Sequence, residues 1–138
     1  MSNSIELIMQ AQSQNEKLAR NVVGAFFAQL NPTVEQLEDV KTAVSEAVTN
    51  CIVHAYGGRQ EGKVHIICQL SERTLCVCIT DYGRGIEDVE KAMQPFYTTV
   101  SGGERSGMGF TVMQAFCDSV EVQSRKGETT VKLTKKVA

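Results

Sequence analysis

Several features are scarce or missing in this sequence of 138 residues, and each absence excludes a class of protein. The 14 basic residues do not exceed the 16 acidic ones, so the net charge of −2 predicts no direct binding of nucleic acid. No apolar run approaches the ~18 residues of a transmembrane helix, so we expect no membrane partner. The first residues, MSNSIELIMQ, lack the basic segment of a secretory signal, so we expect no export.

The cysteines do not have the spacing of a metal site. They are Cys51, Cys68, Cys76, Cys78 and Cys117. Cys76 and Cys78 alternate within a predicted strand, so both should point to one face as small apolar side chains. An odd number of thiols without a disulfide or metal pattern is typical of a reducing compartment, which favours the cytoplasm.

Repeats, low-complexity segments and linkers are also missing, so we expect one domain over residues 1–138. A chain of this length buries roughly two-thirds of its unfolded surface without disulfides or metals. No G-x-x-x-x-G-K-[ST] sequence occurs, which excludes a P-loop. The G-x-G segments do not follow the first strand of a βαβ unit, which excludes a Rossmann domain.

Hydrophobic periodicity predicts the secondary structure. Strands are expected at residues 5–9, 63–70, 74–80, 119–125 and 129–136, and helices at 13–30, 33–56, 87–92 and 108–117. The first helix has an apolar stripe made by Leu18, Ala19, Val22, Val23, Phe26, Phe27 and Leu30. Ser13 with Glu16, and Thr33 with Gln36, have the spacing of capping boxes. The pattern predicts an α/β sandwich with a mixed, mostly antiparallel sheet and helices on one face.

The second helix has an unusual polar face. On a helical wheel its apolar side comprises Leu37, Val40, Val44, Ala47, Cys51 and Ala55, whereas Asp39, Thr42, Thr49, Asn50 and Val53 lie with Glu46. An ordinary solvated face is one interpretation, but such faces usually carry charged pairs four residues apart. Asn50 could supply one oxygen ligand to Mg²⁺ beside phosphate oxygens. Glu46, one turn away, could accept a proton from an attacking hydroxyl.

Two glycine segments follow. DYGRG at 81–85 ends a strand, and it is either an irregular turn or a place where a flat ligand approaches the backbone while Asp81 accepts a hydrogen bond. RSGMGF at 105–110 is either a flexible loop or a phosphate site, because the amino end of a helix presents free N–H groups. Arg105 and Ser106 could add a charge and a hydroxyl to that site.

Taken in order, these segments resemble a known superfamily. EAVTN (46–50), DYGRG (81–85) and GMG (107–109) resemble the N, G1 and G2 boxes of the GHKL group, which includes gyrase, Hsp90 chaperones, histidine kinases and mismatch-repair ATPases. SEAVTNCIVHAY, QPFYTT and ERSGMGFTVM resemble the anti-sigma F family of endospore-forming bacteria, over essentially the whole chain. The resemblance implies the Bergerat ATP-binding fold, ATP or ADP with Mg²⁺, and a homodimer. It also implies that the chain inhibits the sporulation sigma factor F and phosphorylates a serine of the anti-anti-sigma factor.

The resemblance implies roles for individual residues as well. Glu46 would be the general base, Asn50 the Mg²⁺ ligand, and Asp81 the acceptor for the adenine amino group, with Thr130 helping through water. Gly83 and Gly85 would line the adenine base. The lid and phosphate contacts would come from Thr98, Arg105, Ser106, Gly107, Met108 and Gly109. Arg20, expected on the exposed side of the first helix, matches a position used for protein partners, although it could be an ordinary surface arginine.

Three other functions remain open at this point. The chain could be a binding-only anti-sigma module, or a bare GHKL ATPase or histidine-kinase catalytic domain. A histidine-kinase catalytic domain would need a phosphoacceptor domain, for which we expect no room in this chain. It could also be a structural α/β domain without a nucleotide.

Overall fold

The computed structural model describes residues 2–57, 62–83, 93 and 109–137. Five strands form one sheet in the order β1-β2-β3-β5-β4. They are β1 (Ser2–Gln10), β2 (Lys63–Ser71), β3 (Thr74–Asp81), β4 (Ser119–Arg125) and β5 (Glu128–Lys136). All four pairs of neighbouring strands run antiparallel, which confirms the mostly antiparallel sheet.

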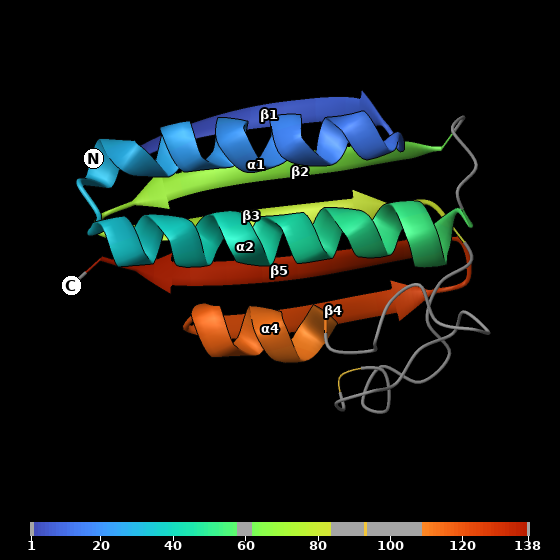
Figure 1. Cartoon of the computed structure of the whole chain (residues 1–138). Helices are drawn as coiled ribbons and strands as arrows, with labels where there is room; N and C mark the ends of the chain where they lie inside the picture. Colours follow the sequence, from blue (N-terminus) through green and yellow to red (C-terminus); the bar gives the residue numbers. More distant parts are fainter. Residues whose placement is uncertain (1, 58–61, 84–92, 94–108, 138) are drawn as a thin grey trace.

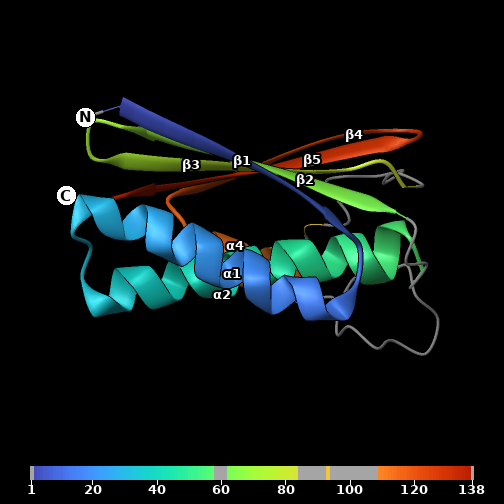
Figure 2. The same cartoon turned by 90° about the horizontal axis from the view of Figure 1, so that it is seen from above.

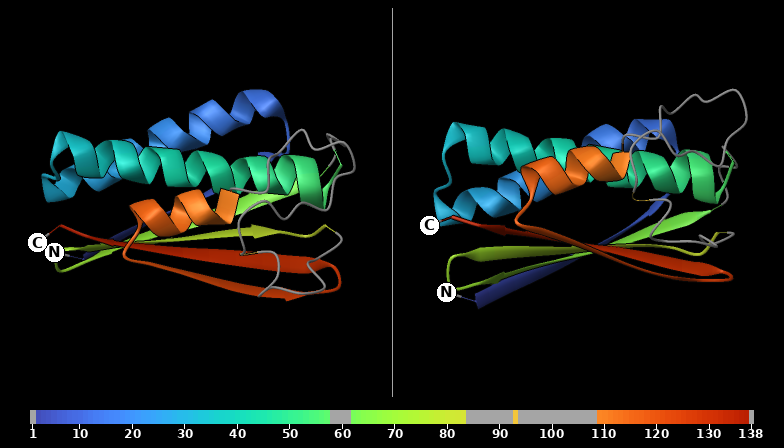
Figure 3. Two further views of the ribbon diagram at one scale, coloured as in Figure 1. Left: turned by 60° about the horizontal axis from the view of Figure 1, so that its bottom comes forward. Right: turned by 90° about the horizontal axis from the view of Figure 1, so that it is seen from below.

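The described helices lie on one face of this sheet, which confirms the predicted sandwich (Figure 1, Figure 2). They are α1 (Ser13–Phe27), α2 (Val34–Asn50) and α4 (Gly109–Phe116), with a 3-10 turn η1 (Ala28–Leu30) after α1 and a π-helix η2 (Cys51–Ala55) after α2. α4 runs antiparallel to α2 and lies beside it over the β4–β5 side of the sheet (Figure 3). The helix predicted at residues 87–92 lies outside the described residues.

The core forms between the helices and the inner face of the sheet. Every second residue of the strands is buried there: Val64, Ile66, Cys68 and Leu70 on β2, Leu75, Val77 and Ile79 on β3, and Val131 and Leu133 on β5. Ala19, Val23, Phe26, Phe27 and Leu30 face them from α1 and η1, as the stripe predicted. Leu18 was wrongly included in that stripe, because it lies at the edge of the buried arc and 50% of it is exposed. Each fully buried aliphatic side chain contributes about 1.5–3 kcal/mol to folding.

The outer face of the sheet is not covered by the described helices (Figure 2). Cys76 and Cys78 lie half-buried on it, on the same side of β3 as predicted, and Ile67 of β2 pairs with Cys78. His65 contacts the carboxylate of Glu6 on the same face. All five cysteines are free. No helix in the described part of the chain is both long enough and apolar enough to cross a membrane.

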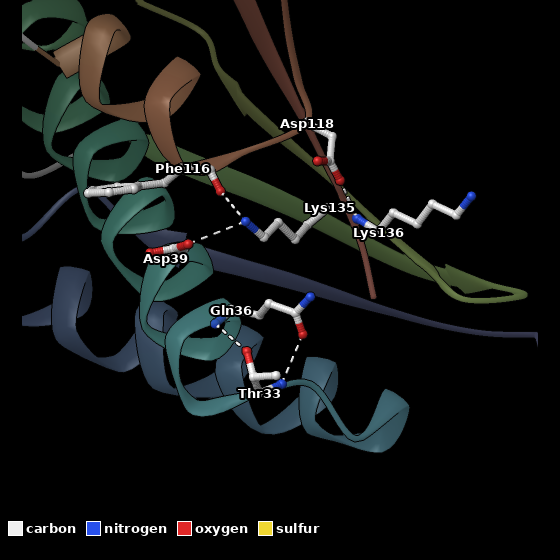
Figure 4. Close-up of polar contacts among 7 residues, drawn as sticks. All are labelled: Thr33, Gln36, Asp39, Phe116, Asp118, Lys135 and Lys136. Atoms are coloured by element: carbon white, nitrogen blue, oxygen red, sulfur yellow. Dashed lines mark hydrogen bonds and ion pairs between the residues drawn. The ribbon is translucent and has the colours of Figure 1, made fainter. Parts of the chain in front are cut away.

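The two predicted capping boxes have different outcomes. The box at α2 is confirmed: the Gln36 N–H donates to the Thr33 hydroxyl at 3.0 Å, and the Thr33 N–H donates to the Gln36 side chain at 2.9 Å (Figure 4). The box at α1 is wrong, because Gln12 occupies the N-cap position without a side-chain bond and Ser13 already lies in the helix. Glu16 instead accepts a hydrogen bond from the Ser45 hydroxyl of α2 at 3.3 Å, so it serves the packing of the two helices.

We therefore expect Thr33→Ala to lower the free energy of unfolding by about 1 kcal/mol, because the substitution removes the acceptor for a helix N–H. Ser13→Ala is the matched control at the start of α1, where the change should stay within about 0.5 kcal/mol. Urea unfolding followed by circular dichroism measures both values. Equal losses for the two variants would contradict the assignment of the caps.

Candidate functional site

The polar side of α2 is not a solvated face. Its members Asp39, Thr42, Glu46, Thr49, Asn50 and Val53 are all half-buried. α4 packs against α2, and its first residue, Gly109, lies beside Asn50 and Glu46. One Glu46 carboxylate oxygen is fully buried. The structure thus favours the interpretation of this side as part of a site over that of an ordinary helix surface.

Gly109 brings the last glycine segment onto this polar side. A Cβ placed on Gly109 would lie 3.2 Å from both terminal atoms of the Asn50 side chain and 3.4 Å from a carboxylate oxygen of Glu46. A Cβ at this position would force the amide or the carboxylate to shift by a few tenths of an ångström, so glycine suits so close an approach. The sequence pattern predicted that these three residues share a site, and the structure brings them together.

Gly83 brings the first glycine segment to the other side of the same helix. A Cβ on Gly83 would lie 2.4 Å from the carbonyl oxygen of Ala55, closer than any real contact. Ala55 ends the π-helix η2, which starts directly after Asn50. Such widened turns are frequent at functional sites, and this one changes the direction in which the last side chains of the helix point.

Asp81 is buried at the end of β3, where 5% of it is exposed. One carboxylate oxygen accepts a hydrogen bond from the Gly83 N–H at 3.0 Å, and the thiol of Cys51 donates another. Burial raises the pKa of the Asp81 carboxyl above its ordinary value of 3.8, and these two hydrogen bonds oppose that rise. Burial and the neighbouring Asp81 raise the pKa of the Cys51 thiol well above its ordinary range, so this thiol stays protonated and remains a donor.

Tyr56 holds the loop around Asp81 in place, a role that the sequence analysis did not predict. Its hydroxyl donates to the carbonyl of Lys63 at 2.6 Å and accepts from the N–H of Tyr82 at 2.7 Å. Its ring also fills the space beside Gly62, where a Cβ would lie 2.6 Å from ring carbons. Tyr56 therefore ties the end of η2 to β2 and to the residue after Asp81. The one feature of the sequence that points to Tyr56 is its position directly before Gly57, which ends the predicted helix.

The structure corrects the placement of Thr130. This residue pairs with Thr80 across β3 and β5, and their hydroxyls lie 2.8 Å apart on the outer face of the sheet. Thr129 is the residue directly opposite Asp81 on the inner face, and 4% of it is exposed. Its hydroxyl lies 2.7 Å from that of Ser124. Strand alternation from Val131 and Leu133 would have identified Thr129, because buried residues on one strand share a parity.

The other predicted site residues have a mixed outcome. Arg20 is half-buried on α1 rather than exposed, and within the described part of the chain its Nε atom is buried without a hydrogen-bond partner. The remaining residues predicted to contact nucleotide lie outside the described residues: Gly85, Thr98, Arg105, Ser106, Gly107 and Met108.

The oxygen atoms of this site suit Mg²⁺ held mainly by phosphates. Among the described residues no group of three or more His, Cys, Asp or Glu side chains could hold a metal by itself. Mg²⁺ keeps several waters and takes one or two protein oxygens beside phosphate. The Asn50 amide oxygen, next to the Gly109 backbone and the Glu46 carboxylate, fits that requirement.

Comparisons with known proteins agree with this geometry. The model of the histidine kinase-like ATPase domain family matches residues 9–135. An anti-sigma F factor of Caldanaerobacter subterraneus is 54% identical over 138 residues, covering 97% of this chain and 94% of the relative. One of Clostridium novyi is 49% identical over 136 residues, covering 98% and 95%. One of Halalkalibacterium halodurans is 52% identical over 124 residues, covering 90% and 85%.

Solved structures share the fold at low sequence identity. The RsbU and RsbW domains of Rv1364c from Mycobacterium tuberculosis align with a TM-score of 0.71 and 17% identity, over 98% of this chain and 32% of that one. The catalytic domain of the histidine kinase ThkA aligns with a TM-score of 0.63 and 14% identity, over 98% and 96%. Together with the relatives that are about half identical, the paired glycine approaches to α2 and the buried Asp81 lead to one conclusion: the chain belongs to the anti-sigma F factor family of the histidine kinase-like ATPase domains.

Proposed function

We propose that this chain binds Mg-ATP between α2, α4 and the end of β3, and uses it to phosphorylate a serine of an anti-anti-sigma factor. The observation that carries the proposal is the position of two consecutive residues. Asn50 lies against Gly109, at the amino end of α4, while Cys51 contacts Asp81. The proposed phosphate subsite and the proposed adenine subsite thus lie next to each other, at two consecutive residues of one helix. A nucleotide has the same arrangement, with an anionic end and a flat, hydrogen-bonding end.

The described residues suit distinct parts of the reaction. The Asp81 carboxylate would accept a hydrogen bond from the adenine amino group, because the Gly83 N–H and the Cys51 thiol fix it in place. The amino end of α4 would attract phosphate oxygens through its free N–H groups. Glu46 would orient a serine hydroxyl of the partner and accept its proton. Mg²⁺ at Asn50 would supply charge neutralisation for the triphosphate, which phosphoryl transfer needs more than covalent catalysis.

Two protein partners follow from the same proposal. The relatives are named anti-sigma F factors, and we infer that this chain likewise binds and inhibits sporulation sigma factor F. The half-buried guanidinium of Arg20 on α1 is the proposed contact for an acidic or carbonyl group of a partner. Because a sigma factor acts on RNA polymerase, we place the chain in the cytoplasm.

The proposed homodimer would use the outer face of the sheet. Exposed apolar side chains lie there on adjacent strands: Ile8 is 61% exposed and Ile67 37% exposed. The half-buried thiols of Cys76 and Cys78 continue this surface on β3. An apolar patch on a sheet face without helices is the kind of surface that a second copy covers. Sedimentation measures the oligomeric state, and Ile67→Glu should shift it toward the monomer.

The decisive experiment uses the purified chain, labelled ATP and a candidate anti-anti-sigma protein. Acid-stable phosphoserine on that protein supports the proposed kinase. Acid-labile phosphohistidine would favour a histidine-kinase-like domain, and phosphate release alone would favour a bare ATPase. Sigma-factor binding with no phosphate transfer, and no strengthening by ATP, would favour a binding-only module.

Glu46→Ala should abolish phosphate transfer while ATP affinity changes little, because the carboxylate acts on the attacking hydroxyl rather than on the nucleotide. Glu38→Ala is the matched control, since Glu38 lies on the same helix with its side chain 61% exposed. Transfer is followed with labelled ATP and affinity by calorimetry. Kinase activity retained in the Glu46 variant would remove this residue from the mechanism.

Asp81→Asn should raise stability at neutral pH and weaken ATP binding strongly. The folded state binds the Asp81 proton more tightly than the unfolded state does, because burial raises its pKa. The charged carboxylate therefore costs stability at neutral pH, and this cost disappears as the pH falls through the raised pKa, above the ordinary 3.8. The stability gain of Asp81→Asn should shrink over the same range.

Thermal unfolding between neutral and acidic pH tests the stability part of this prediction. Asp118→Asn is its control, because Asp118 is exposed and the loss of its charge should give no such gain. A gain independent of pH, or unchanged ATP affinity in the Asp81 variant, would contradict the proposed role.

Thr129→Val should weaken ATP binding several-fold, whereas Thr130→Val should leave it unchanged, because only Thr129 shares a face with Asp81. A polar contact to a ligand contributes about 0.5–1.5 kcal/mol, roughly two- to ten-fold in affinity. Ser124→Ala removes the hydrogen bond between the Ser124 and Thr129 hydroxyls but keeps the Thr129 hydroxyl itself. This variant should therefore bind ATP normally. If Thr130→Val weakened ATP binding and Thr129→Val did not, Thr130 rather than Thr129 would belong to the site.

A further inference from the structure

We propose that Lys135 and Asp39 form a positioning device that holds α4 in register with α2, so that Gly109 stays against Asn50 and Glu46. The inference deepens the proposed function, because it assigns control of the phosphate subsite to residues far from it. Asp39 lies on the same side of α2 as Glu46 and Asn50 but nearer the other end of the helix, and Lys135 contacts it there. They act through the position of the helix whose amino end forms the phosphate subsite.

The contacts lie at the carboxyl end of α4. The Lys135 ammonium donates to the carbonyl of Phe116, the last residue of α4, at 2.6 Å (Figure 4). The same ammonium lies 3.4 Å from a carboxylate oxygen of Asp39 on α2. Lys135 belongs to β5, so one side chain joins the sheet and the two helices. Figure 4 shows the ammonium between the carbonyl and the carboxylate.

Burial gives this arrangement more strength than a surface ion pair has. The side chains of Lys135 and Asp39 are only 13% and 22% exposed, whereas the Arg125–Glu128 pair in the β4–β5 turn is 79% and 36% exposed. Exposed pairs contribute little to stability, and water screens a half-buried pair less. The cation also lies at the negative end of the α4 dipole, where a positive charge is favourable.

The two ends of α4 are therefore both fixed to the same side of α2. Asp39, Glu46 and Asn50 are spaced by seven and four residues, close to whole turns, so they form one line along α2. α4 runs antiparallel along this line, with Gly109 at the Asn50 end and Phe116 at the Asp39 end (Figure 3). Between the two ends, Phe110 and Met113 of α4 are buried in the apolar core.

Apolar packing alone fixes the position of a short helix along its axis only weakly, because the hydrophobic effect is non-directional. The hydrogen bond to Phe116 and the charge of Asp39 supply directional contacts. The segment after α4 adds more: the Asp118 N–H donates to Thr134 at 2.8 Å, and the Lys136 N–H donates to the Asp118 carboxylate at 2.5 Å. Movement of α4 along α2 would have to break these contacts first.

The test compares Lys135→Met with wild type in the intact chain. Lys135→Met keeps an unbranched apolar side chain, one atom shorter than that of lysine, but removes the donor and the charge. Calorimetric titration with ATP and NMR titration with adenosine separate the two subsites. We expect ATP affinity to fall about five-fold or more, with adenosine affinity within about two-fold of wild type. Lys135→Arg, which can still reach the carbonyl and the carboxylate, should restore most of the ATP affinity.

Hydrogen exchange gives a readout that needs no nucleotide. The amides of residues 113–117 bond back to the first turns of α4, as Cys117 does to Met113 at 3.0 Å. These amides should exchange faster in Lys135→Met than in wild type. Thr33→Ala is the matched control: it weakens the start of α2 without touching α4, so it should leave these amides and the ATP-to-adenosine ratio unchanged.

Asp39→Asn is the second variant, and it keeps the Lys135–Phe116 bond. A smaller effect than that of Lys135→Met, and non-additive losses in the double variant, would support the three-part contact. The inference would be overturned if Lys135→Met had the same hydrogen-exchange rates at residues 113–117 as wild type and the same ratio of ATP affinity to adenosine affinity. If wild type itself binds no ATP, the proposed function fails, and the exchange measurement decides the inference by itself.

Discussion

The site depends on two close approaches of backbone to α2 and its π-helical end, one that leaves no room for a Cβ atom and one that leaves little. Gly83 lies against the carbonyl of Ala55, and Gly109 lies against the side chains of Asn50 and Glu46. The first contact brings the end of β3 to the helix, and the second brings the start of α4 to it. A side chain at Gly83 would push the end of β3 away from the helix, and one at Gly109 would force the Asn50 and Glu46 side chains to shift. The glycines are therefore needed for proximity, since neither serves a turn with positive φ.

The site also retains polar groups where the core would favour apolar ones. Asp81 occupies the inner face of β3 in line with Leu75, Val77 and Ile79, and its burial raises the pKa of the carboxyl. The Gly83 N–H and the Cys51 thiol compensate for part of this cost by hydrogen bonding to the carboxylate. Such a local conflict with the surrounding pattern is expected at a functional site, where binding rather than folding determines the residue.

Much of this arrangement could be predicted from the sequence, and the failures have physical causes. Alternation gave the strands, and helical periodicity gave the buried stripe, because both patterns are properties of single elements. The capping box at Ser13 failed because Glu16 packs against Ser45 of another helix, a contact that local spacing does not contain. Thr130 was placed wrongly because a one-residue shift on a strand reverses the face of a side chain. The link from Lys135 to Asp39 joins residues 96 positions apart, so no sequence motif marks it.

The two layers of the sandwich separate the proposed tasks. The proposed phosphate subsite and Arg20 belong to the helical layer, and Asp81 lies on the inner face of the sheet that packs against it. Ile8, Ile67 and the thiols of β3 lie on the outer face, which the described helices leave uncovered (Figure 2). A second copy docked on the sheet would thus leave the Glu46 side of α2 uncovered. A partner bound through Arg20 would lie on the same layer as the phosphate subsite, where its serine could reach Glu46. Under this proposal dimerisation and phosphorylation would not compete for surface, whereas the two protein partners, if both used α1, would compete with each other.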